Sequence, residues 1–306
     1  MKAVRFDEYG GVDVLEVREV DDPVPAAGRV LVRVKAAAIN PGEAAIREGA
    51  LAQRWPSTFP SGEGSDFSGT VEALGDGVAT FAVGDPVLGW SDERSSHAEL
   101  VSVPVEQLST KPEAVSWEVA GSLFVAPCAG YAAVRAVAPQ AGETVVVSAA
   151  AGGVGGTAAQ LARHAGATVI GLVGAANHDW LRSRDIVPVA YGEGQAERIR
   201  AAAGDGGVDA FIDTFGDGYV DLAVALGVAP QRIATVIDWG AAERVGAQAT
   251  GGSSIVSAVV LAELAGLVAD GALEIPIART YPLDEVRDAY RDLAKRHTRG
   301  KIVLLP

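Results

Sequence analysis

Cysteine is nearly absent from this sequence of 306 residues, which contains only Cys128. A single cysteine excludes an internal disulfide and any zinc site built from several thiolates. The four histidines, His97, His164, His178 and His297, are scattered without the spacing of metal ligands. We therefore expect no metal centre. Cys128 lies among small residues with no histidine close by in sequence, which favours a packed side chain over a nucleophile.

Positive charge and long apolar runs are also scarce. Lys and Arg number 25 against 39 Asp and Glu, so the net charge is −14, and the acids are spread along the whole chain. Nucleic acid binds poorly to such a surface, and solubility is the simpler meaning of the charge. No apolar run approaches the roughly 20 residues that span a bilayer, and the first residues lack a signal-peptide core. We expect a cytoplasmic protein without nucleic-acid or membrane partners.

No G-x-S-x-G motif is present, which argues against a hydrolase.

The residue pattern changes near position 116. Before it, short alternating apolar runs broken by Gly and Pro indicate a compact, mostly β unit. After it, an Ala-rich helical stretch at 119–138 is followed by alternating apolar strands and helices, which is typical of a parallel sheet. A helix at 256–270, a second at 283–296 and a strand at 301–305 follow. This length and this order predict two domains.

The most informative stretch is 144–174, which reads as strand, glycine turn, helix, strand. The G-x-G-x-x-G pattern occurs here with Ala150 in place of its first glycine, followed by Gly152 and Gly155. Small residues let the backbone approach a pyrophosphate, and the N-terminus of the next helix carries partial positive charge. The context predicts a dinucleotide site at residues Ala150, Gly152, Gly153, Val154 and Gly155. The alternative is a glycine-rich turn that closes an ordinary strand–helix unit without a ligand.

Segments across nearly the whole length match one family in the right order. They are residues 39–49, 64–69, 81–87, 141–143, 150–155, 166–170 and 297–304. On these motifs the chain resembles the zinc-independent quinone oxidoreductases, similar to zeta-crystallin, of the medium-chain dehydrogenase/reductase superfamily. The resemblance implies an α/β fold with a GroES-like β-barrel domain and a Rossmann domain with a doubly wound parallel sheet. It places the GroES-like catalytic domain at 1–120, the Rossmann cofactor-binding domain at 121–254, and a C-terminal segment at 255–306 that returns to the catalytic domain.

The resemblance also implies catalytic residues in the N-terminal part. Zinc-dependent members use Cys or His where this chain has Asn40, in agreement with the absence of metal ligands. Asn40 would lie near the nicotinamide, where an amide can donate and accept hydrogen bonds; the alternative is a turn residue before a proline. Glu43 would face the same cleft, and Arg47 either binds substrate or is solvated or salt-bridged. Ala45 stands where the family often has a tyrosine, and so no protein general acid is named.

The cofactor is expected to be NADPH. An NAD-selective unit has an Asp or Glu about 20 residues after the glycine turn, but here the place is taken by Val173 and Gly174. Nothing acidic there repels a 2′-phosphate. The following Asn177, His178, Arg182 and Arg184 offer donors, and His178 stands about where related reductases have a lysine. An exposed loop histidine is the alternative.

By resemblance, further residues would contact the cofactor. Tyr191 would line the adenosine phosphate pocket, unless it is only a half-buried strand residue. Backbone groups at Phe215, Ile237 and Asp238 follow strands at the edge where ligands bind. Lys301 could add charge near a phosphate, or could simply be solvated.

The expected reaction is hydride transfer from NADPH to a small-molecule electron acceptor, a quinone or an α,β-unsaturated carbonyl (enone). One alternative is reduction of enoyl thioesters or enones with little quinone activity. Another is a catalytically silent NADPH-binding protein, because a lens crystallin shares this fold. A homodimer is expected by resemblance.

Overall fold

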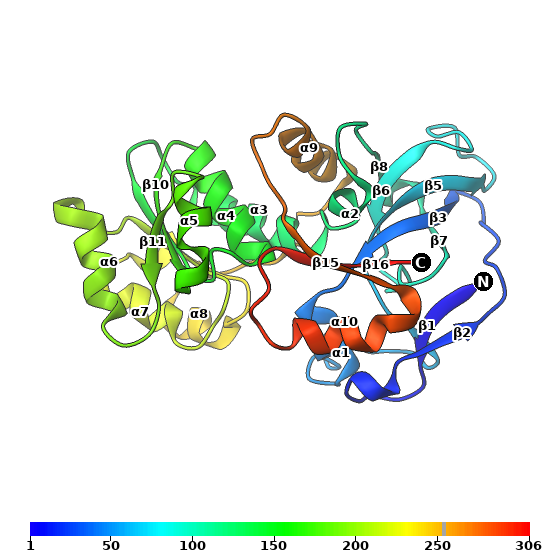
Figure 1. Cartoon of the computed structure of the whole chain (residues 1–306), viewed down its shortest axis with the longest axis horizontal. Helices are drawn as coiled ribbons and strands as arrows, with labels where there is room; N and C mark the ends of the chain where they lie inside the picture. Colours follow the sequence, from blue (N-terminus) through cyan, green and yellow to red (C-terminus); the bar gives the residue numbers. More distant parts are fainter. Residues whose placement is uncertain (253–254) are drawn as a thin grey trace. The chain divides into compact units, whose positions relative to one another are not determined.

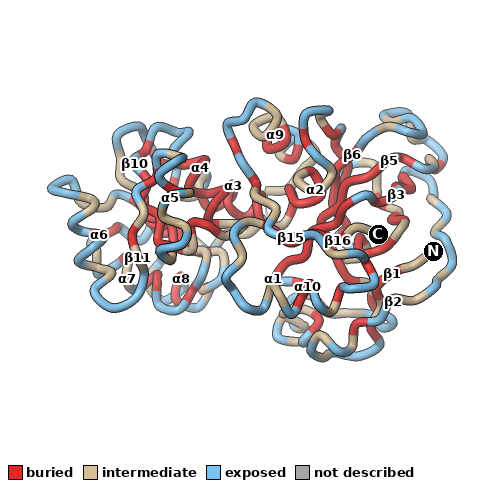
Figure 2. The backbone as a smooth tube through the Cα atoms, in the orientation of Figure 1, coloured by how far each residue is buried: buried red, intermediate tan, exposed pale blue. Residues whose placement is uncertain are grey.

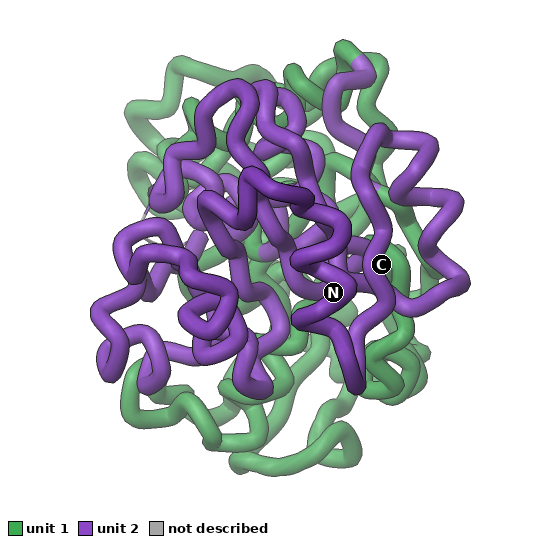
Figure 3. The backbone as a smooth tube through the Cα atoms, turned by 90° about the vertical axis from the view of Figure 1, so that its left-hand side faces the viewer, with its two compact units in different colours: residues 1–125, 256–270, 276–306 green, residues 126–255, 271–275 purple. Residues whose placement is uncertain are grey.

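A computed structural model describes residues 1–252 and 255–306 of the chain. These residues form two compact units, drawn in different colours in Figure 3. The first unit holds residues 1–125, 256–270 and 276–306, and the second holds residues 126–255 and 271–275. The division differs from the expected one at 121–125, which join the first unit, and at 271–275, which join the second. The expected boundary at residue 254 lies outside the described residues.

The first unit is built mainly from antiparallel strands. A larger sheet has the strand order β15-β16-β3-β5-β6-β8, with β7 also paired to β3, and a smaller sheet has the order β2-β1-β4. The strands are β1 (Lys2–Phe6), β2 (Glu16–Glu19), β3 (Arg29–Ala38), β4 (Ser61–Gly62), β5 (Asp66–Leu74), β6 (Pro86–Trp90), β7 (Leu100–Pro104), β8 (Leu108–Thr110), β15 (Ile277–Pro282) and β16 (Lys301–Leu305). The alternating apolar residues of β3 and β5 pack inside this sheet with those of β6 and β7. Figure 2 shows β3 and β16 as largely buried strands.

Within the described residues, four α-helices belong to this unit. Figure 1 labels each of them. They are α1 (Pro41–Arg47), α2 (Trp117–Ala120), α9 (Ala258–Ala269) and α10 (Val286–Leu293), joined by the 3-10 turns η1 (Val12–Val14), η2 (Val105–Gln107) and η7 (Leu283–Glu285). The apolar face of α10 packs with residues of β1, η1 and β16 in one buried cluster. The predicted helix at 283–296 is therefore a 3-10 turn followed by a shorter α-helix.

The single Ala-rich helix predicted at 119–138 is wrong, because two helices occupy this stretch. Helix α2 ends at Gly121, where a Cβ would lie 2.4 Å from the carbonyl oxygen of Ala36. The chain then turns, and α3 (Val125–Val137) begins where the Asp66 carboxylate accepts hydrogen bonds from the amides of Phe124 and Val125. The helix is interrupted here because Gly121 packs closely against β3 and because Asp66, distant in sequence, caps the start of α3. The local sequence indicates neither contact.

The second unit is a parallel sheet with helices, as predicted. Its strand order is β11-β10-β9-β12-β13-β14, and every pairing is parallel. The strands are β9 (Thr144–Val147), β10 (Thr168–Val173), β11 (Val187–Ala190), β12 (Ala210–Asp213), β13 (Ile233–Thr235) and β14 (Gln248–Ala249). Besides α3, the helices are α4 (Gly153–His164), α5 (His178–Arg182), α6 (Gln195–Ala203), α7 (Tyr219–Ala225) and α8 (Trp239–Val245), with 3-10 turns η3 (Ala175–Asn177), η4 (Gly204–Gly206) and η5 (Pro230–Arg232).

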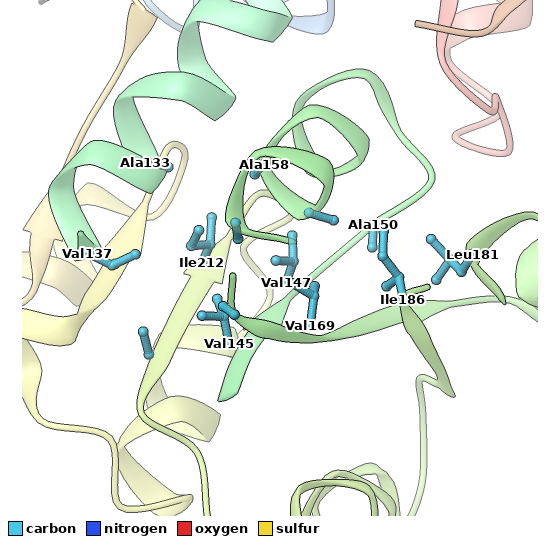
Figure 4. Packing of buried hydrophobic residues seen from close by; sticks show 14 of the residues in the cluster. Ala133, Val137, Val145, Val147, Ala150, Ala158, Val169, Leu181, Ile186 and Ile212 are labelled. Carbon is cyan, nitrogen blue, oxygen red and sulfur yellow. The ribbon is translucent and has the colours of Figure 1, made fainter. Parts of the chain in front are cut away.

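Buried apolar residues fill both faces of this sheet. On one face, Val145 and Val147 of β9 pack with Ala158 of α4 and Ile212 of β12 (Figure 4). On the other face, Val146, Ile170 and Phe211 pack with residues of α6 and α7. Because both faces are covered, the strands are continuous apolar runs without alternation. No helix within the described residues is long and apolar enough to cross a membrane.

Candidate functional site

The carboxyl edge of the second unit's sheet collects most of the residues predicted to bind a dinucleotide. Along this edge, the loop after β11 carries Tyr191, the loop after β10 carries Gly174, the loop after β9 is the glycine turn, and the loops after β12 and β13 carry Phe215, Ile237 and Asp238. The strand order reverses between β9 and β12, and open parallel sheets bind ligands outside such a point. The topology therefore gathers these residues at one edge of one unit.

The glycine turn joins β9 to α4 at very short range. A Cβ on Gly155 would lie 2.4 Å from the carbonyl oxygen of Ala149, so only glycine permits this approach of helix to strand. Gly152 is the N-cap residue of α4. The first amides of the helix, at Gly153 and Val154, have no partner within the helix and lie at its positive end.

Ala150 replaces the first glycine of the pattern without disturbing the turn. Its side chain is fully buried. Opposite it on β10 stands Gly171, where an added Cβ would lie 2.8 Å from the Cβ of Ala150. The missing side chain at Gly171 therefore provides the space that the methyl group of Ala150 fills.

Gly174 and Tyr191 lie together at the ends of β10 and β11. The hydroxyl of Tyr191 is 3.5 Å from the position that a Cβ on Gly174 would take. Tyr191 is 54% exposed and so is not the half-buried strand residue of the alternative, while Val173 is buried. No acid stands among residues 173–178. This corner presents a phenol beside a glycine, with no carboxylate from the end of β10.

The other predicted donors near this corner are differently placed. Arg182 binds Asp179 at 2.8 Å, and Arg184 binds Glu274 and stacks over Trp180. Both guanidinium groups therefore already have partners, although an arginine has five N–H donors and the Arg182 side chain is exposed. His178 is half-buried, and its Nε2 atom is buried without a partner among the described residues. Asn177 and His178 remain predicted donors for a ligand.

Phe215 and Ile237 are surface residues of the second unit, 37% and 51% exposed. Asp238 caps α8, because its carboxylate accepts a hydrogen bond of 3.0 Å from the amide of Ala241. The Asp238 side chain is therefore occupied, and its backbone N–H and C=O also have partners, Thr235 Oγ1 and the Ala242 amide. The contact of this backbone with a cofactor stays a prediction.

Asn40, Glu43 and Lys301 lie in the first unit, in a buried polar cluster at the start of α1. Asn40 is the N-cap residue of this helix, and its amide N–H donates to Glu43 Oε2 at 2.8 Å. Both side chains are almost fully buried. The alternative interpretation of Asn40, a turn residue before a proline, therefore describes part of its role, because Asn40 caps the N-terminus of α1.

The hydrogen bonds of the Asn40 side chain fix its orientation. Its Nδ2 group donates to Asp66 Oδ2 at 2.7 Å and to Glu43 Oε1 at 3.2 Å, and its Oδ1 accepts from Lys301 Nζ. Both amide hydrogens are therefore used, and Oδ1 also takes part in the capping box with the backbone amide of Glu43. As oriented here, Asn40 has no N–H left for a developing oxyanion, which corrects the expectation that it both donates and accepts.

Lys301 is neither solvated nor at the surface. It is 4% exposed, and its Nζ donates to Asn40 Oδ1 and, at 3.2 Å, to the carbonyl oxygen of Ile39. Burial lowers the pKa of the Lys301 ammonium, while the carboxylates of Asp66 and Glu43 oppose that shift. An ammonium has three N–H groups, so one is left after these two bonds.

Glu43 and Asp66 are acceptors with every oxygen engaged. Glu43 accepts from the backbone and side chain of Asn40, from the Ser65 amide at 2.8 Å and from the Tyr290 hydroxyl at 3.0 Å. Burial raises the pKa of both carboxyls, and Lys301 opposes the rise. Glu43 thus positions Asn40 and the start of α1, whereas the expectation had it facing an open cleft.

Arg47 forms a salt bridge, as in the alternative to a substrate-binding role. Its NH1 donates to Glu63 Oε1 at 2.6 Å, and its guanidinium lies 4.6 Å from the centre of the Tyr290 ring. Arg47 and Glu63 are 1% and 3% exposed. Burial raises the pKa of Glu63 to about 8, although Arg47 opposes the rise.

We expect the stability of the folded protein to depend on pH because His97 is buried. Its ring is buried, with Nε2 3.2 Å from the carbonyl oxygen of Ala38, and burial lowers its pKa from 6.5 to about 4. Between these values the unfolded chain binds a proton that the folded protein does not, so stability is full above pH 6.5 and falls as the pH drops through 4.

We expect this loss to reach about 1.4 kcal/mol per pH unit relative to a His97→Gln variant, which keeps a donor for Ala38. Urea unfolding of both proteins at several pH values measures it. His164→Gln, at an exposed histidine, serves as the control and should keep the wild-type slope. Equal slopes for wild type and His97→Gln would contradict the expectation.

The comparisons with known proteins agree with this geometry. Residues 26–181, just over half of the chain, match the family model "Alcohol dehydrogenase GroES-like domain", and residues 184–304 match "Zinc-binding dehydrogenase". The chain belongs to the medium-chain dehydrogenase/reductase superfamily. Its two units are the GroES-like and Rossmann-like parts of that fold, and the predicted fold class is confirmed.

Relatives of this chain are named quinone oxidoreductases. The rat protein is 33% identical over 221 residues, 70% of this chain and 66% of its own length, slightly under two thirds. The human protein is 27% identical, with 100% of this chain and 98% of the relative covered. The Escherichia coli quinone oxidoreductase solved in complex with NADPH is 25% identical, with a TM-score of 0.87 and full coverage of both chains.

Within residues 1–252 and 255–306, the chain has no group of three or more His, Cys, Asp or Glu side chains that could hold a metal ion. Sequence reasoning missed Asp66, Glu63 and Tyr290 as members of the polar cluster. Asp66 could have been predicted, because an acid at the start of a strand of mostly apolar or small residues needs a partner when it is buried. Tyr290 was not, because nothing in the sequence of α10 indicates that it faces Glu43.

Proposed function

We propose that this reductase transfers hydride from NADPH to a small-molecule electron acceptor, a quinone or an α,β-unsaturated carbonyl, without a metal ion. The observation that carries the proposal is the carboxyl edge of the parallel sheet. There a glycine turn precedes the unpaired first amides of α4, and no acid follows β10. The names of the relatives, and the NADPH in the E. coli structure, support it.

The residues of the second unit fit a dinucleotide phosphate. The amides at the start of α4 are anion donors, and the buried Nε2 of His178 lacks a partner among the described residues. Ala150, Gly152, Gly153, Val154 and Gly155 would hold the pyrophosphate. Val173, Gly174, His178 and Tyr191 would hold the adenosine half, and Phe215, Ile237 and Asp238 the other half.

Bound NADPH would supply the hydride. In the first unit, Asn40 would lie near the nicotinamide carboxamide, and Oδ1 is its only side-chain atom that can accept a hydrogen bond. The remaining N–H of Lys301 can donate to an anionic oxygen, either of a phosphate or of the acceptor as it takes up the electron pair. Glu43 would keep Asn40 in place, and water would provide the proton.

Oxidation of NADPH and NADH with a panel of quinones, enones and enoyl thioesters tests this proposal. Turnover of quinones or enones with NADPH supports it. Turnover restricted to enoyl thioesters or enones favours that narrower class of reductase. Cofactor binding that raises the melting temperature without any turnover favours a silent NADPH-binding protein.

Gly174→Asp is expected to reverse the cofactor preference. A carboxylate at this position repels a 2′-phosphate and accepts hydrogen bonds from an unmodified ribose. The backbone of Gly174 has φ −72°, and a new Cβ would meet Tyr191 only at ordinary contact distance, so the fold tolerates the change. We expect NADPH affinity to fall about tenfold or more while NADH affinity is kept or improved. Gly206→Asp adds the same charge in the η4 turn as a control, and an unchanged preference in Gly174→Asp would contradict the proposed adenosine site.

We also propose a homodimer. By resemblance, its interface is expected at the strand in residues 232–237 and at the helix after residue 254. That strand is β13, which lies between β12 and β14, so the sheet edge that could pair with a second copy is β14. Light scattering of the purified protein tests it, and a monomer mass at micromolar concentration would contradict it. The cytoplasmic location stays a prediction.

A further inference from the structure

Three neighbouring strands of the parallel sheet end in polar side chains that bind one another. Ser148 follows β9, Asp213 ends β12 and Thr235 ends β13, and all three are fully buried. Ser148 Oγ donates to Asp213 Oδ1 at 2.9 Å, and Thr235 Oγ1 donates to Asp213 Oδ2 at 2.8 Å. Such a group is costly to bury unless every atom has a partner.

The same atoms hold the two loops that follow β12 and β13. In loop 214–216, the Phe215 and Gly216 amides donate to Asp213 Oδ1 at 3.0 and 2.9 Å, and the Thr214 amide donates to Ser148 Oγ at 2.8 Å. In loop 236–238, the amides of residues 237 and 238 donate to Thr235 Oγ1 at 3.2 and 3.0 Å. One carboxylate therefore fixes both loops, directly or through a hydroxyl.

The direction of each bond follows from chemistry. A carboxylate accepts only, so both hydroxyl hydrogens point toward Asp213. The hydroxyl lone pairs are then turned to the loop amides, and neither hydroxyl can reverse without leaving a buried donor against a donor. The two loops also meet, because a Cβ on Gly216 would lie 3.4 Å from a methyl of Ile237.

We propose that Asp213, Ser148 and Thr235 are positioning residues that set loops 214–216 and 236–238 for the nicotinamide half of the dinucleotide. In a sheet of this order, the two halves of a dinucleotide lie on opposite sides of the point where the strand order reverses. Gly174 and Tyr191 follow β10 and β11 on one side, and the two loops follow β12 and β13 on the other. The proposal rests on the proposed function. The network would support binding of the nicotinamide half, which is identical in NADPH and NADH.

The test uses Thr235→Val, which keeps the shape of the side chain and removes the hydroxyl. Thr235→Ser restores a hydroxyl. Thr144→Val makes the same change at the opposite end of the sheet, at the start of strand β9, which β12 separates from β13. Equilibrium binding of NADPH and NADH is measured for each protein, together with amide hydrogen exchange of the peptide that contains residues 236–238 in the absence of cofactor.

We expect Thr235→Val to weaken both cofactors by the same factor, roughly 5- to 20-fold, with faster exchange in loop 236–238. Thr235→Ser should recover most of the affinity, and Thr144→Val should match the wild type. A purely structural role would accelerate exchange without changing affinity, and this result would overturn the proposal. Weakening of NADPH alone would also overturn it, because the loops would then serve the 2′-phosphate. If the wild type binds neither cofactor, the proposed function fails and the positioning role fails with it, whereas normal binding by wild type and Thr235→Val together refutes the positioning role alone.

Discussion

Lys301→Met is expected to lower the free energy of unfolding by about 3–5 kcal/mol. The ammonium is 4% exposed and binds Asn40 and Ile39, and it is the cation that opposes the pKa rise of Glu43 and Asp66. Methionine fills similar space but leaves these carboxylates buried without that cation. Urea unfolding at neutral pH measures the loss.

Lys295→Met provides the matched control, because Lys295 is 67% exposed in its ion pair with Asp292 and the same change there should cost less than about 1 kcal/mol. A pH series gives a second signature. Without Lys301, the pKa values of Glu43 and Asp66 rise further, and a carboxyl with a raised pKa contributes stability at low pH that is lost as the pH rises. The deficit of Lys301→Met should therefore shrink on acidification. A deficit that is small, or independent of pH, would show that Lys301 does not neutralise this cluster.

Glu63→Leu is expected to have a comparable effect, about 3–5 kcal/mol, because it leaves the buried Arg47 guanidinium with only the exposed Glu48 carboxylate, 3.9 Å away. Arg47→Met should cost less. A guanidinium cannot lose its proton in a protein, whereas burial raises the pKa of the Glu63 carboxyl, which can take up a proton once Arg47 no longer opposes that rise. The double variant, apolar at both positions, should be more stable than Glu63→Leu alone.

Unfolding of the two single variants and the double variant forms a complete cycle. Glu72→Leu breaks the half-exposed ion pair with Arg33 and should cost less than about 1 kcal/mol. If Arg47→Met costs more than Glu63→Leu, or if the double variant is the least stable of the three, the buried pair does not behave as argued.

The parallel-sheet unit could be predicted from sequence because its signals are local. The apolar run of β9, the turn at Gly152 and Gly155, and the absence of an acid near Gly174 all lie within one short stretch. Chain order then implied that Phe215 and Ile237 share its edge. The Asp213 network was partly visible, since an acid at the end of a buried strand needs partners, but its two hydroxyl ligands are 65 and 22 residues away in sequence.

The polar cluster of the first unit could not be predicted in the same way. Asn40 was identified by resemblance, but its orientation depends on Asp66 and Lys301, which β5 and β16 bring beside it. Lysines are mostly exposed, so composition alone favoured a solvated Lys301. Only the pairing of β16 with β3 shows that this lysine is enclosed.

The place of β16 in the first unit has a consequence for synthesis on the ribosome. This strand lies between β15 and β3, and the contact of Lys301 with Ile39 spans 262 residues of chain. At bacterial or eukaryotic translation rates, roughly 13–50 s separate the emergence of these two residues. All six strands of the parallel sheet emerge in that interval. The second unit can therefore fold first. Until β16 emerges, one edge of β3 in the first unit is unpaired, and the carboxylates of Glu43 and Asp66 lack the Lys301 ammonium.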